Sequence, residues 1–451
     1  MPLKLPSDLS TLLTSGLWRS AGSLGIKIAT AGLTYLTYVV LSRTMATPDY
    51  GTFAVGLSLA TVLAVIAGLG QQTAILRLWS EENVAGRSDR AVAAVRSGAS
   101  LTVLASLITA ALLVAGAAIA AAVAPMPDGV LHLYACAVLV LPLALAEYQS
   151  SALRAQGSLW TALAPRDLLW RIALPIAVLL LAQRGIALTG PQALLLAAAI
   201  LLAALAIQGL FARRQGHVLA PAFRGVIAFW RERGRLSRWF LYGAVIDTVA
   251  LNADTLIVGL QLQQDAAATY FNASRTAGLM TLFTYAATLV IAPLLARYFH
   301  AGDLRKAQAI TTVSAWSGFA FSLGAFAVFA LFGDRVLAIF GDAYTGGWGV
   351  LLLLSFGLLF DAGTGSSRTT MMMTGHERAY VAIAGGATLL GLVAQVAIIP
   401  TYGLLGAATA NMTVRIVTQL AIGWYCVARI GLDPTIFGVL RLNRPPVAVQ
   451  P

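Results

Sequence analysis

The feature that most constrains this chain is a series of long apolar segments that recurs along its whole length. A helix that crosses a bilayer needs about 20 consecutive apolar residues, and about twelve runs of that kind can be counted. They lie at about residues 17–42, 51–76, 97–124, 130–152, 162–183, 191–211, 239–261, 269–296, 308–332, 347–367, 379–399 and 404–428. The pattern predicts an all-α polytopic membrane protein with about twelve transmembrane helices.

The overall composition leaves no room for a separate soluble domain. Of 451 residues, 59% are hydrophobic and 11% are charged, and the mean hydropathy is +0.80. Soluble domains carry about 25% charged residues. The net charge of +12 would suggest nucleic acid in a soluble protein, but here it is typical of cytoplasmic loops. We therefore expect no nucleic-acid partner.

The arginines are distributed unevenly between the two sets of loops. One alternating set carries most of them, with the largest cluster between residues 213 and 238. The opposite set carries only Arg43, Arg184 and Arg335. Because basic loops stay in the cytoplasm, both chain termini are expected there.

The basic segment at residues 213–238 separates two similar halves. We expect an N-terminal six-helix bundle at residues 1–211, a linker at 212–238, a C-terminal six-helix bundle at 239–430 and a cytoplasmic tail at 431–451. Transporters are commonly built from two such repeats, with the substrate site between them. Within the linker, "IAFW" is either a piece lying on the membrane surface or part of a solvated loop.

The first apolar run has a polar stripe, although it is long enough to cross a membrane. At about 100° per residue, six polar side chains fall within one narrow arc. They are Arg19, Ser23, Lys27, Thr30, Thr34 and Thr37. Such a face lines water or substrate, although Arg19 could also reach the cytoplasmic headgroups. Lys27 lies about 12 Å deeper along the axis, so it is the sharper candidate.

The second half carries further ionisable residues inside predicted helices. Asp247, Asp254 and Gln261 are seven residues apart and should share a face. Asn411, Arg415 and Gln419 follow one another at i+4 steps. Asp361 and Arg368 should lie on one side of a single helix. The helix that follows Asp247 and Asp254 along the chain opens with Asn272 and Arg275.

These residues predict a site for an anion. Charged side chains inside a membrane mark substrate or ion pathways, and a surplus of cations suits phosphate or pyrophosphate. The substrate-binding candidates are Arg19, Lys27, Arg275, Arg415, Asn272 and Asn411. Three carboxylates are candidates for coupling to H⁺ or Na⁺, namely Asp247, Asp254 and Asp361. Structural ion pairs are the alternative interpretation for the same residues.

Charged residues of the first half have simpler explanations. Glu147 lies near a cytoplasmic helix end, where it can reach the surface or pair with Arg154. Arg166, Asp167 and Arg171 open the next apolar run, and anchoring at the membrane interface accounts for them. The histidines and cysteines show no ligand spacing, so we predict no metal site and no cofactor.

Several motifs resemble a known family. The segment "LSRTMATPDYGTFAVGLSLATVLAVIAGLGQQTAILR" is similar to the helix one–two signature of polysaccharide flippases in the multidrug/oligosaccharidyl-lipid/polysaccharide exporter superfamily. The matching positions are Arg43, Pro48, Asp49, Tyr50, Gly51, Gly70 and Arg77. The segment "NADTLIVGLQLQQDAAATYFNASR" resembles the helix seven–eight region, and "FGDAYTGG" and "IIPTYGLLGAATAN" resemble later turns.

The resemblance covers about residues 15 to 428. It implies two six-helix bundles around a cavity of alternating access, and export of an undecaprenyl-pyrophosphate-linked oligosaccharide across the bacterial inner membrane. Membrane lipids and the lipid-linked oligosaccharide are the implied partners, and a polysaccharide polymerase and chain-length proteins are further candidates. No family motif that we find fixes Lys27.

Three alternatives remain open at this point. A drug or cation antiporter of the same superfamily would more naturally keep carboxylates without compensating cations. A major-facilitator transporter also has twelve helices, but "AGRSDRA" matches its loop motif poorly. A membrane polymerase or ligase usually carries a long outer catalytic loop, and no phosphate-binding loop or acid–base pair outside the membrane is present. We therefore expect a transporter rather than an enzyme.

Overall fold

The computed structural model describes residues 25, 29–123 and 129–441 of the chain. In that part of the chain every regular element is a helix. A helix satisfies its backbone hydrogen bonds internally, so it can cross hydrocarbon without unpaired polar groups. The expectation of an all-α fold is confirmed.

The first half begins with a helix over residues 29–44, which we call the N-terminal helix. The elements that follow it are α2 (Thr47–Ala67), α3 (Gln71–Val84), α4 (Ser88–Val123), α5 (Gly129–Ala155), α6 (Leu159–Leu163), η1 (Ala164–Leu169), α7 (Trp170–Gln183) and α8 (Gly190–Arg214).

The second half begins with a helix that includes much of the expected linker. Its elements are α9 (Val226–Gln261), α10 (Gln264–Gly278), α11 (Thr281–His300), α12 (Leu304–Ala338), η2 (Asp342–Gly347), α13 (Trp348–Gly363), α14 (Ser367–Met373), α15 (Glu377–Tyr425), η3 (Cys426–Ile430) and η4 (Ile436–Arg441). The "IAFW" segment is thus the first turn of α9, continuous with a membrane helix.

Within the described ranges, eight helices are long and apolar enough to cross a membrane. The expected number is higher because several spans are interrupted or joined. One expected span is divided between α10 and α11, and another among α6, η1 and α7. α15 holds two expected spans, joined at Gly403, where φ is 58°. The first expected span lies partly outside the described residues.

The second membrane segment of each half is interrupted. In the first half the chain turns between α2 and α3, where Leu69 and Gly70 have φ of 49° and 72°. In the second half α10 ends at Gly278 and α11 begins at Thr281. The break at Gly70 also allows a close approach to α9, because a Cβ there would come within 2.2 Å of the Ser237 carbonyl oxygen. The faint sequence similarity of the halves is thus accompanied by a shared interruption.

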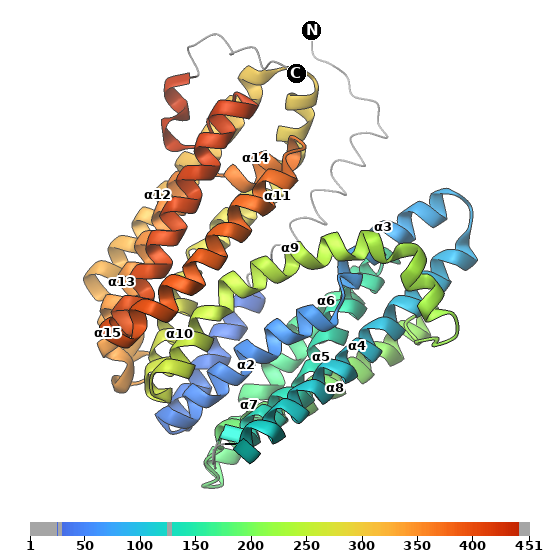
Figure 1. The fold of residues 1–451 in the computed structure, drawn as a ribbon, viewed down its shortest axis with the longest axis vertical. Coiled ribbons are helices and arrows are strands. Elements are labelled where there is room, and N and C mark those ends of the chain that lie inside the picture. Colours follow the sequence, from blue (N-terminus) through green and yellow to red (C-terminus); the bar gives the residue numbers. More distant parts are fainter. Residues whose placement is uncertain (1–24, 26–28, 124–128, 442–451) are drawn as a thin grey trace.

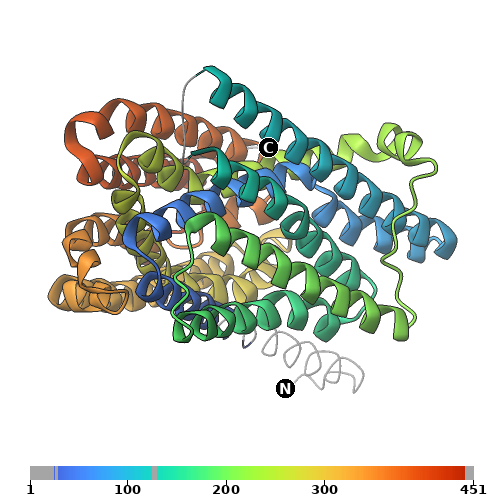
Figure 2. The same cartoon turned by 90° about the horizontal axis from the view of Figure 1, so that it is seen from below.

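The helices form two groups that lie side by side (Figure 1 and Figure 2). α2 packs against both α9 and α10, and these contacts join the groups. Figure 1 shows the groups close together where α2 and α10 begin, and diverging toward α3 on one side and α11 and α14 on the other. We call these the joined end and the splayed end.

The joined end is held by hydrogen bonds and aromatic contacts between the halves. Ser42 Oγ donates to the Phe340 carbonyl at 3.0 Å, and Arg43 donates to the carbonyls of Ile339 and Ala338 at 2.6 and 3.0 Å. An aromatic cluster fills the space behind them. Its members are Tyr35, Tyr38, Tyr50, Phe271, Phe340 and Tyr344. The joined end is therefore closed in this conformation.

At the splayed end, α12 begins with a side-chain cap. The Asp303 carboxylate accepts a hydrogen bond from the Lys306 backbone amide at 3.1 Å. It also forms an ion pair with the Lys306 ammonium at 2.8 Å. Hydrogen bonding to the Lys306 side chain lowers the pKa of the Asp303 carboxyl. The cap satisfies an amide that the first turn of a helix otherwise leaves unpaired.

Candidate functional site

Asp254 lies at the centre of a polar cluster between α9, α10 and α15. Its carboxylate accepts hydrogen bonds from Tyr270 Oη at 2.9 Å, from Gln395 Nε2 at 2.6 Å and from Asn411 Nδ2. All of these donors are neutral. Since hydrogen bonds to neutral donors leave a net negative charge in place, this group suits a bound cation or proton.

Asp361 on α13 has a cationic partner instead. Arg415 Nη1 lies 3.3 Å from its Oδ2, and Gln419 Nε2 donates to Oδ1. Both partners come from α15, one turn apart. This ion pair joins Arg415, which the sequence predicted to bind substrate, to Asp361, which it predicted to couple to an ion.

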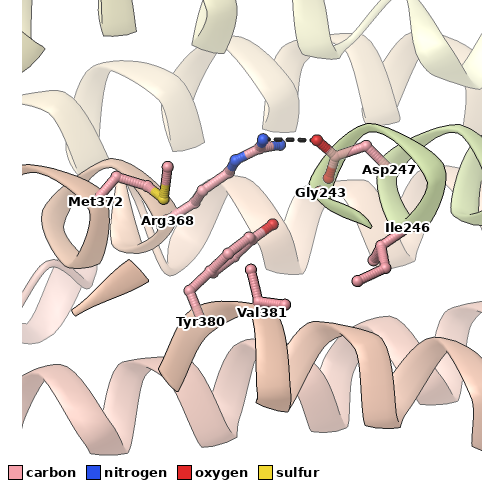
Figure 3. A pocket seen from close by; sticks show the side chains of 7 residues that line it. All are labelled: Gly243, Ile246, Asp247, Arg368, Met372, Tyr380 and Val381. Carbon is pink, nitrogen blue, oxygen red and sulfur yellow. Dashed lines mark hydrogen bonds and ion pairs between the residues drawn. The ribbon is translucent and has the colours of Figure 1, made fainter. Parts of the chain in front are cut away.

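Asp247 on α9 forms a second ion pair, with Arg368 of α14. The Arg368 Nη2 and Asp247 Oδ2 atoms are 2.7 Å apart, and the guanidinium lies 5.3 Å from the centre of the Tyr380 ring. Figure 3 shows this pair in a small pocket, above Tyr380 and Val381. The pocket joins α9 to α14 and α15.

The expected shared faces of α9 and α15 are confirmed. Asp247, Asp254 and Gln261 all contact α14 or α15, and Gln261 Nε2 donates to the Val396 carbonyl at 3.0 Å. On α15, Asn411, Arg415 and Gln419 all contact carboxylates of α9 or α13. Helical periodicity was sufficient to group these residues.

The expectation that Asp361 and Arg368 share one side of a helix is wrong. α13 ends at Gly363, Gly365 has φ of 61°, and α14 begins at Ser367. The break interrupts the period on which the expectation rested. As a result, Asp361 turns to α15 while Arg368 turns to α9.

Arg275 on α10 is a half-buried cation whose partners differ from those of Arg368 and Arg415. Its Nη2 donates to Asn252 Oδ1 at 2.9 Å, and the guanidinium lies 4.7 Å from the centre of the Phe271 ring. Among the described residues no carboxylate lies within 4.0 Å of its nitrogen atoms, and its Nε is buried without a hydrogen-bond partner. An uncompensated cation of this kind attracts anions.

Asn272, the neighbour of Arg275, lies in the joined end. Its side chain is completely buried, and its Oδ1 accepts a hydrogen bond from Tyr50 Oη at 2.7 Å. Its Nδ2 has no partner in the described part of the chain. The amide therefore links α2 to α10, and it can reach a ligand only when these helices separate.

The first half holds an ion cluster that the sequence did not reveal. Asp167, whose side chain is 2% exposed, lies 3.5 Å from Arg166 and 3.6 Å from Arg171. Arg166 also pairs with Glu147, whose side chain stays 45% exposed. Of the two alternatives for Glu147, access to the surface is retained, and the described residues show no ion pair between Glu147 and Arg154. The cluster joins α5, η1 and α7, and the Arg166 and Arg171 side chains are 16% and 18% exposed.

A π-helix brings these residues together. Arg166 and Asp167 lie in η1, which begins at Ala164 before Pro165. The proline in this run was the one available sequence signal, because prolines and π-helices both interrupt regular helices, and π-helices are frequent at functional sites.

The polar stripe of the N-terminal helix faces this cluster. Arg171 Nε donates to Thr34 Oγ1 at 2.6 Å, and Thr37 Oγ1 donates to the Arg171 carbonyl at 3.2 Å. Arg19 and Lys27 lie outside the described residues. The part of the stripe that the structure describes is thus packed on α7.

The site is a set of charged and amide groups between helices. In the described part of the chain no group of three or more His, Cys, Asp or Glu side chains could hold a metal ion. Binding and movement of a charged ligand is the function that these groups can serve.

Comparison with known proteins assigns the chain to a family. The family of polysaccharide biosynthesis proteins matches residues 17–299. The chain belongs to this family. No curated protein matches it.

Solved structures share the fold of this polysaccharide biosynthesis protein. It is similar to a lipid II flippase in an inward closed conformation, with a TM-score of 0.72, 14% identity and coverage of 92% of this chain and 90% of that chain. It is also similar to an inward-facing multidrug resistance transporter of the MATE family, with a TM-score of 0.65, 14% identity and coverage of 91% of this chain and 94% of that chain. A third similar structure is a MOP superfamily transporter from Pyrococcus furiosus, with a TM-score of 0.54, 14% identity and coverage of 93% of each chain. The fold is that of these transporters of the MOP superfamily.

Proposed function

We propose that this protein is a flippase for lipid-linked oligosaccharides. It moves undecaprenyl-pyrophosphate-linked sugar units from the cytoplasmic to the outer leaflet of the bacterial inner membrane, with both termini in the cytoplasm. The pyrophosphate binds at the interface of the two halves, while the polyprenyl tail remains in the bilayer. The lipid-linked oligosaccharide and membrane lipids are its partners, and a polysaccharide polymerase and chain-length proteins are candidate protein partners.

The observation that carries this proposal is the environment of Arg275. Its charge faces the neutral amide of Asn252 and the ring of Phe271, so it is available to an anion. Arg415 supplies a second cation, although its ion pair with Asp361 compensates part of its charge. We propose Arg19 and Lys27 as further contacts for the pyrophosphate, and Asn411 and Asn272 as contacts for polar groups of the substrate.

The arrangement of the halves supports alternating access. The joined end is closed by Ser42, Arg43 and the aromatic cluster, whereas the helices diverge at the splayed end (Figure 1). We assign the splayed end to the cytoplasm, because the arginine-rich loops are there. Substrate enters from that side, and separation of α2 from α10 then releases it outward.

Asp254 is the carboxylate that we propose for ion coupling. Asp247 and Asp361 each form an ion pair with an arginine, which compensates their charge. Asp254 has only neutral donors, so H⁺ or Na⁺ can compensate its charge without breaking an ion pair. Binding of the ion would then reset the transporter.

Deletion of the gene in its natural host tests the proposal. The expected result is loss of surface glycan together with accumulation of undecaprenyl-pyrophosphate-linked oligosaccharide on the cytoplasmic side. A plasmid copy should restore export, and a copy with Arg275→Gln should not. Normal surface glycan in the deletion strain, in the absence of a second flippase gene, contradicts the proposal.

Antiport of cationic drugs is the second candidate, and Asp254 is the observation that favours it. A carboxylate without a cationic partner can bind an organic cation. Drug accumulation in a pump-deficient strain separates the candidates. A flippase leaves drug levels unchanged, whereas an antiporter lowers them in a manner that Asp254→Asn abolishes.

A further inference from the structure

The first turns of α9 carry three arginines on one face. Arg231, Arg235 and Arg238, which we call the α9 arginine stripe, are separated by four and three residues and are all exposed. At about 100° per residue they fall within an arc of about 60°. No ion pair joins any of them to a carboxylate within the described ranges.

The opposite face of α9 is fixed to the first half. Arg233 pairs with Glu82 at 2.8 Å, and Gln71 Nε2 donates to Ser237 Oγ at 3.0 Å. Both contacts are to α3, and the close approach of Gly70 to Ser237 adds a third. Because these contacts hold α9 by its other side, the stripe points away from α3. Figure 1 shows this part of α9 running from α3 toward the second half.

Two aromatic side chains continue the stripe toward the centre of the protein. Trp239 and Tyr242 are 59% and 50% exposed, and their ring centres are 6.0 Å apart. One turn further along α9, Ile246 and Asp247 line the pocket that contains Arg368 (Figure 3). A row of polar and aromatic groups thus leads from the end of α9 to that pocket.

The length of α9 places the stripe at the depth of lipid headgroups. Its 36 residues span about 54 Å, whereas the hydrocarbon core is about 30 Å thick. If Gln261 lies at the outer boundary of the core, the inner boundary falls near residue 241. Trp239 and Tyr242 then lie at the interface, where aromatic residues are enriched. The stripe lies just beyond, where the pyrophosphate of a polyprenyl lipid must also lie.

We propose that the α9 arginine stripe is a loading site that captures the pyrophosphate head group of the substrate before it reaches the central site. This inference rests on the proposed function, because it assumes a pyrophosphate-linked lipid. Three cations in line complement the two phosphates, and the aromatic pair offers apolar surface for the first part of the chain or for sugars. General attraction of anionic phospholipids is the competing explanation.

The chain offers a matched control for this distinction. Arg213, Arg214 and Arg224 are also exposed, lie on the same side of the membrane and belong to the expected basic linker. A purely topological or general lipid-binding role treats the two sets of arginines alike. A loading site depends on the stripe alone.

The test measures binding to the full-length protein in nanodiscs of neutral phosphatidylcholine. The probes are undecaprenyl pyrophosphate, phosphatidylglycerol and inorganic pyrophosphate. The triple variant R231Q/R235Q/R238Q should weaken binding of undecaprenyl pyrophosphate by about tenfold to a hundredfold. The matched variant R213Q/R214Q/R224Q, which loses the same charge, should change it less than about twofold.

Several results would overturn the loading site. Equal losses in the two triple variants, or an unchanged affinity in the stripe variant, exclude it. If the stripe variant loses affinity for phosphatidylglycerol as much as for undecaprenyl pyrophosphate, the stripe is a general lipid anchor. If the stripe binds inorganic pyrophosphate but not the lipid-linked form, it is a phosphate site without lipid recognition. If the stripe variant unfolds, R231K/R235K/R238K replaces it and should keep most of the affinity. Failure of the unmodified protein to bind undecaprenyl pyrophosphate contradicts the proposed function itself, which distinguishes the two failures.

Discussion

The two halves of the molecule bury their charges in different ways. In the first half Asp167 lies between Arg166 and Arg171, and Glu147 pairs with Arg166, so each charge has a partner of opposite sign. In the second half Arg275 has neutral partners, and so does Asp254. Among the residues that the structure describes, the charged cluster of the first half is fully paired, whereas Arg275 and Asp254 in the second half have no ion-pair partner.

This difference suggests that the paired charges have a structural role and the unpaired charges bind ligands. A buried charge with a full set of partners is costly to separate, so it fixes the position of helices. A buried charge with neutral partners can exchange them for a ligand. We therefore expect the cluster around Asp167 to stabilise the first half. Arg275 and Asp254 in the second half, together with Lys27 in the first apolar run, are then the groups that we expect to bind substrate and ion.

The largest effect should follow from Lys27→Ala. Lys27 lies outside the described residues, but its depth in the first apolar run makes it our leading candidate for contact with the pyrophosphate. Surface glycan export in a complementation assay should be abolished while protein levels stay normal. Full export by this variant excludes Lys27 as a substrate contact.

Arg275→Gln should nearly abolish export, because it removes the cation that lacks a carboxylate partner. A charge-assisted contact to phosphate is worth roughly tenfold or more in affinity. The measurement is binding of undecaprenyl pyrophosphate together with export. Arg275→Lys should recover part of both, since it keeps the charge, and unchanged binding in the Gln variant would contradict the role of Arg275.

Asp254→Asn should separate binding from turnover. The substituted amide cannot carry the charge that H⁺ or Na⁺ compensates, so net export should fall about tenfold or more while undecaprenyl pyrophosphate still binds. Asp361→Asn is the comparison, because that carboxylate pairs with Arg415. Equal dependence of export on the proton or sodium gradient in Asp254→Asn and the unmodified protein would remove Asp254 from the coupling step.

Asp167→Asn should affect stability more than transport. It leaves Arg166 and Arg171 without the carboxylate between them, and breaking a buried pair costs about 3–5 kcal/mol. Thermal unfolding in detergent should shift down by about 5–10 °C. Export per folded molecule should stay close to normal. A stable variant that cannot export would show that the first half also takes part in substrate handling.

Tyr50→Phe should have the smallest effect. It removes the hydrogen bond to Asn272 that links α2 to α10 at the joined end, which is worth about 1 kcal/mol. The population with an open joined end should rise about fivefold, as measured by distances between spin labels on α2 and α10. An unchanged distance distribution would mean that the aromatic cluster alone closes this end.

The sequence was sufficient for the features that depend on length and period. Apolar runs predicted the helices, and the seven-residue and four-residue spacings on α9 and α15 correctly grouped Asp254 and Asn411 with their neighbours. The family resemblance agreed with the match to polysaccharide biosynthesis proteins.

The sequence failed where the contacts depend on breaks and on neighbouring helices. Gly365 interrupts the helix that was expected to hold both Asp361 and Arg368. The π-helix at residues 164–169 turns Arg166 and Asp167 into the bundle, which a regular helical wheel does not show. The contact of Arg171 with Thr34 joins residues 137 positions apart, and no local pattern predicts which distant helices meet.

Transfer of substrate between leaflets tests the central claim most directly. The purified protein is reconstituted in liposomes together with the lipid-linked oligosaccharide that accumulates in the deletion strain, and exposure of the sugar to an impermeant glycosidase is followed over time. We expect the unmodified protein to bring the sugar of both leaflets within reach of the enzyme, and the Arg275→Gln protein to leave the inner leaflet protected. Protection of the inner leaflet by the unmodified protein, or equal transfer by both proteins, would contradict the account.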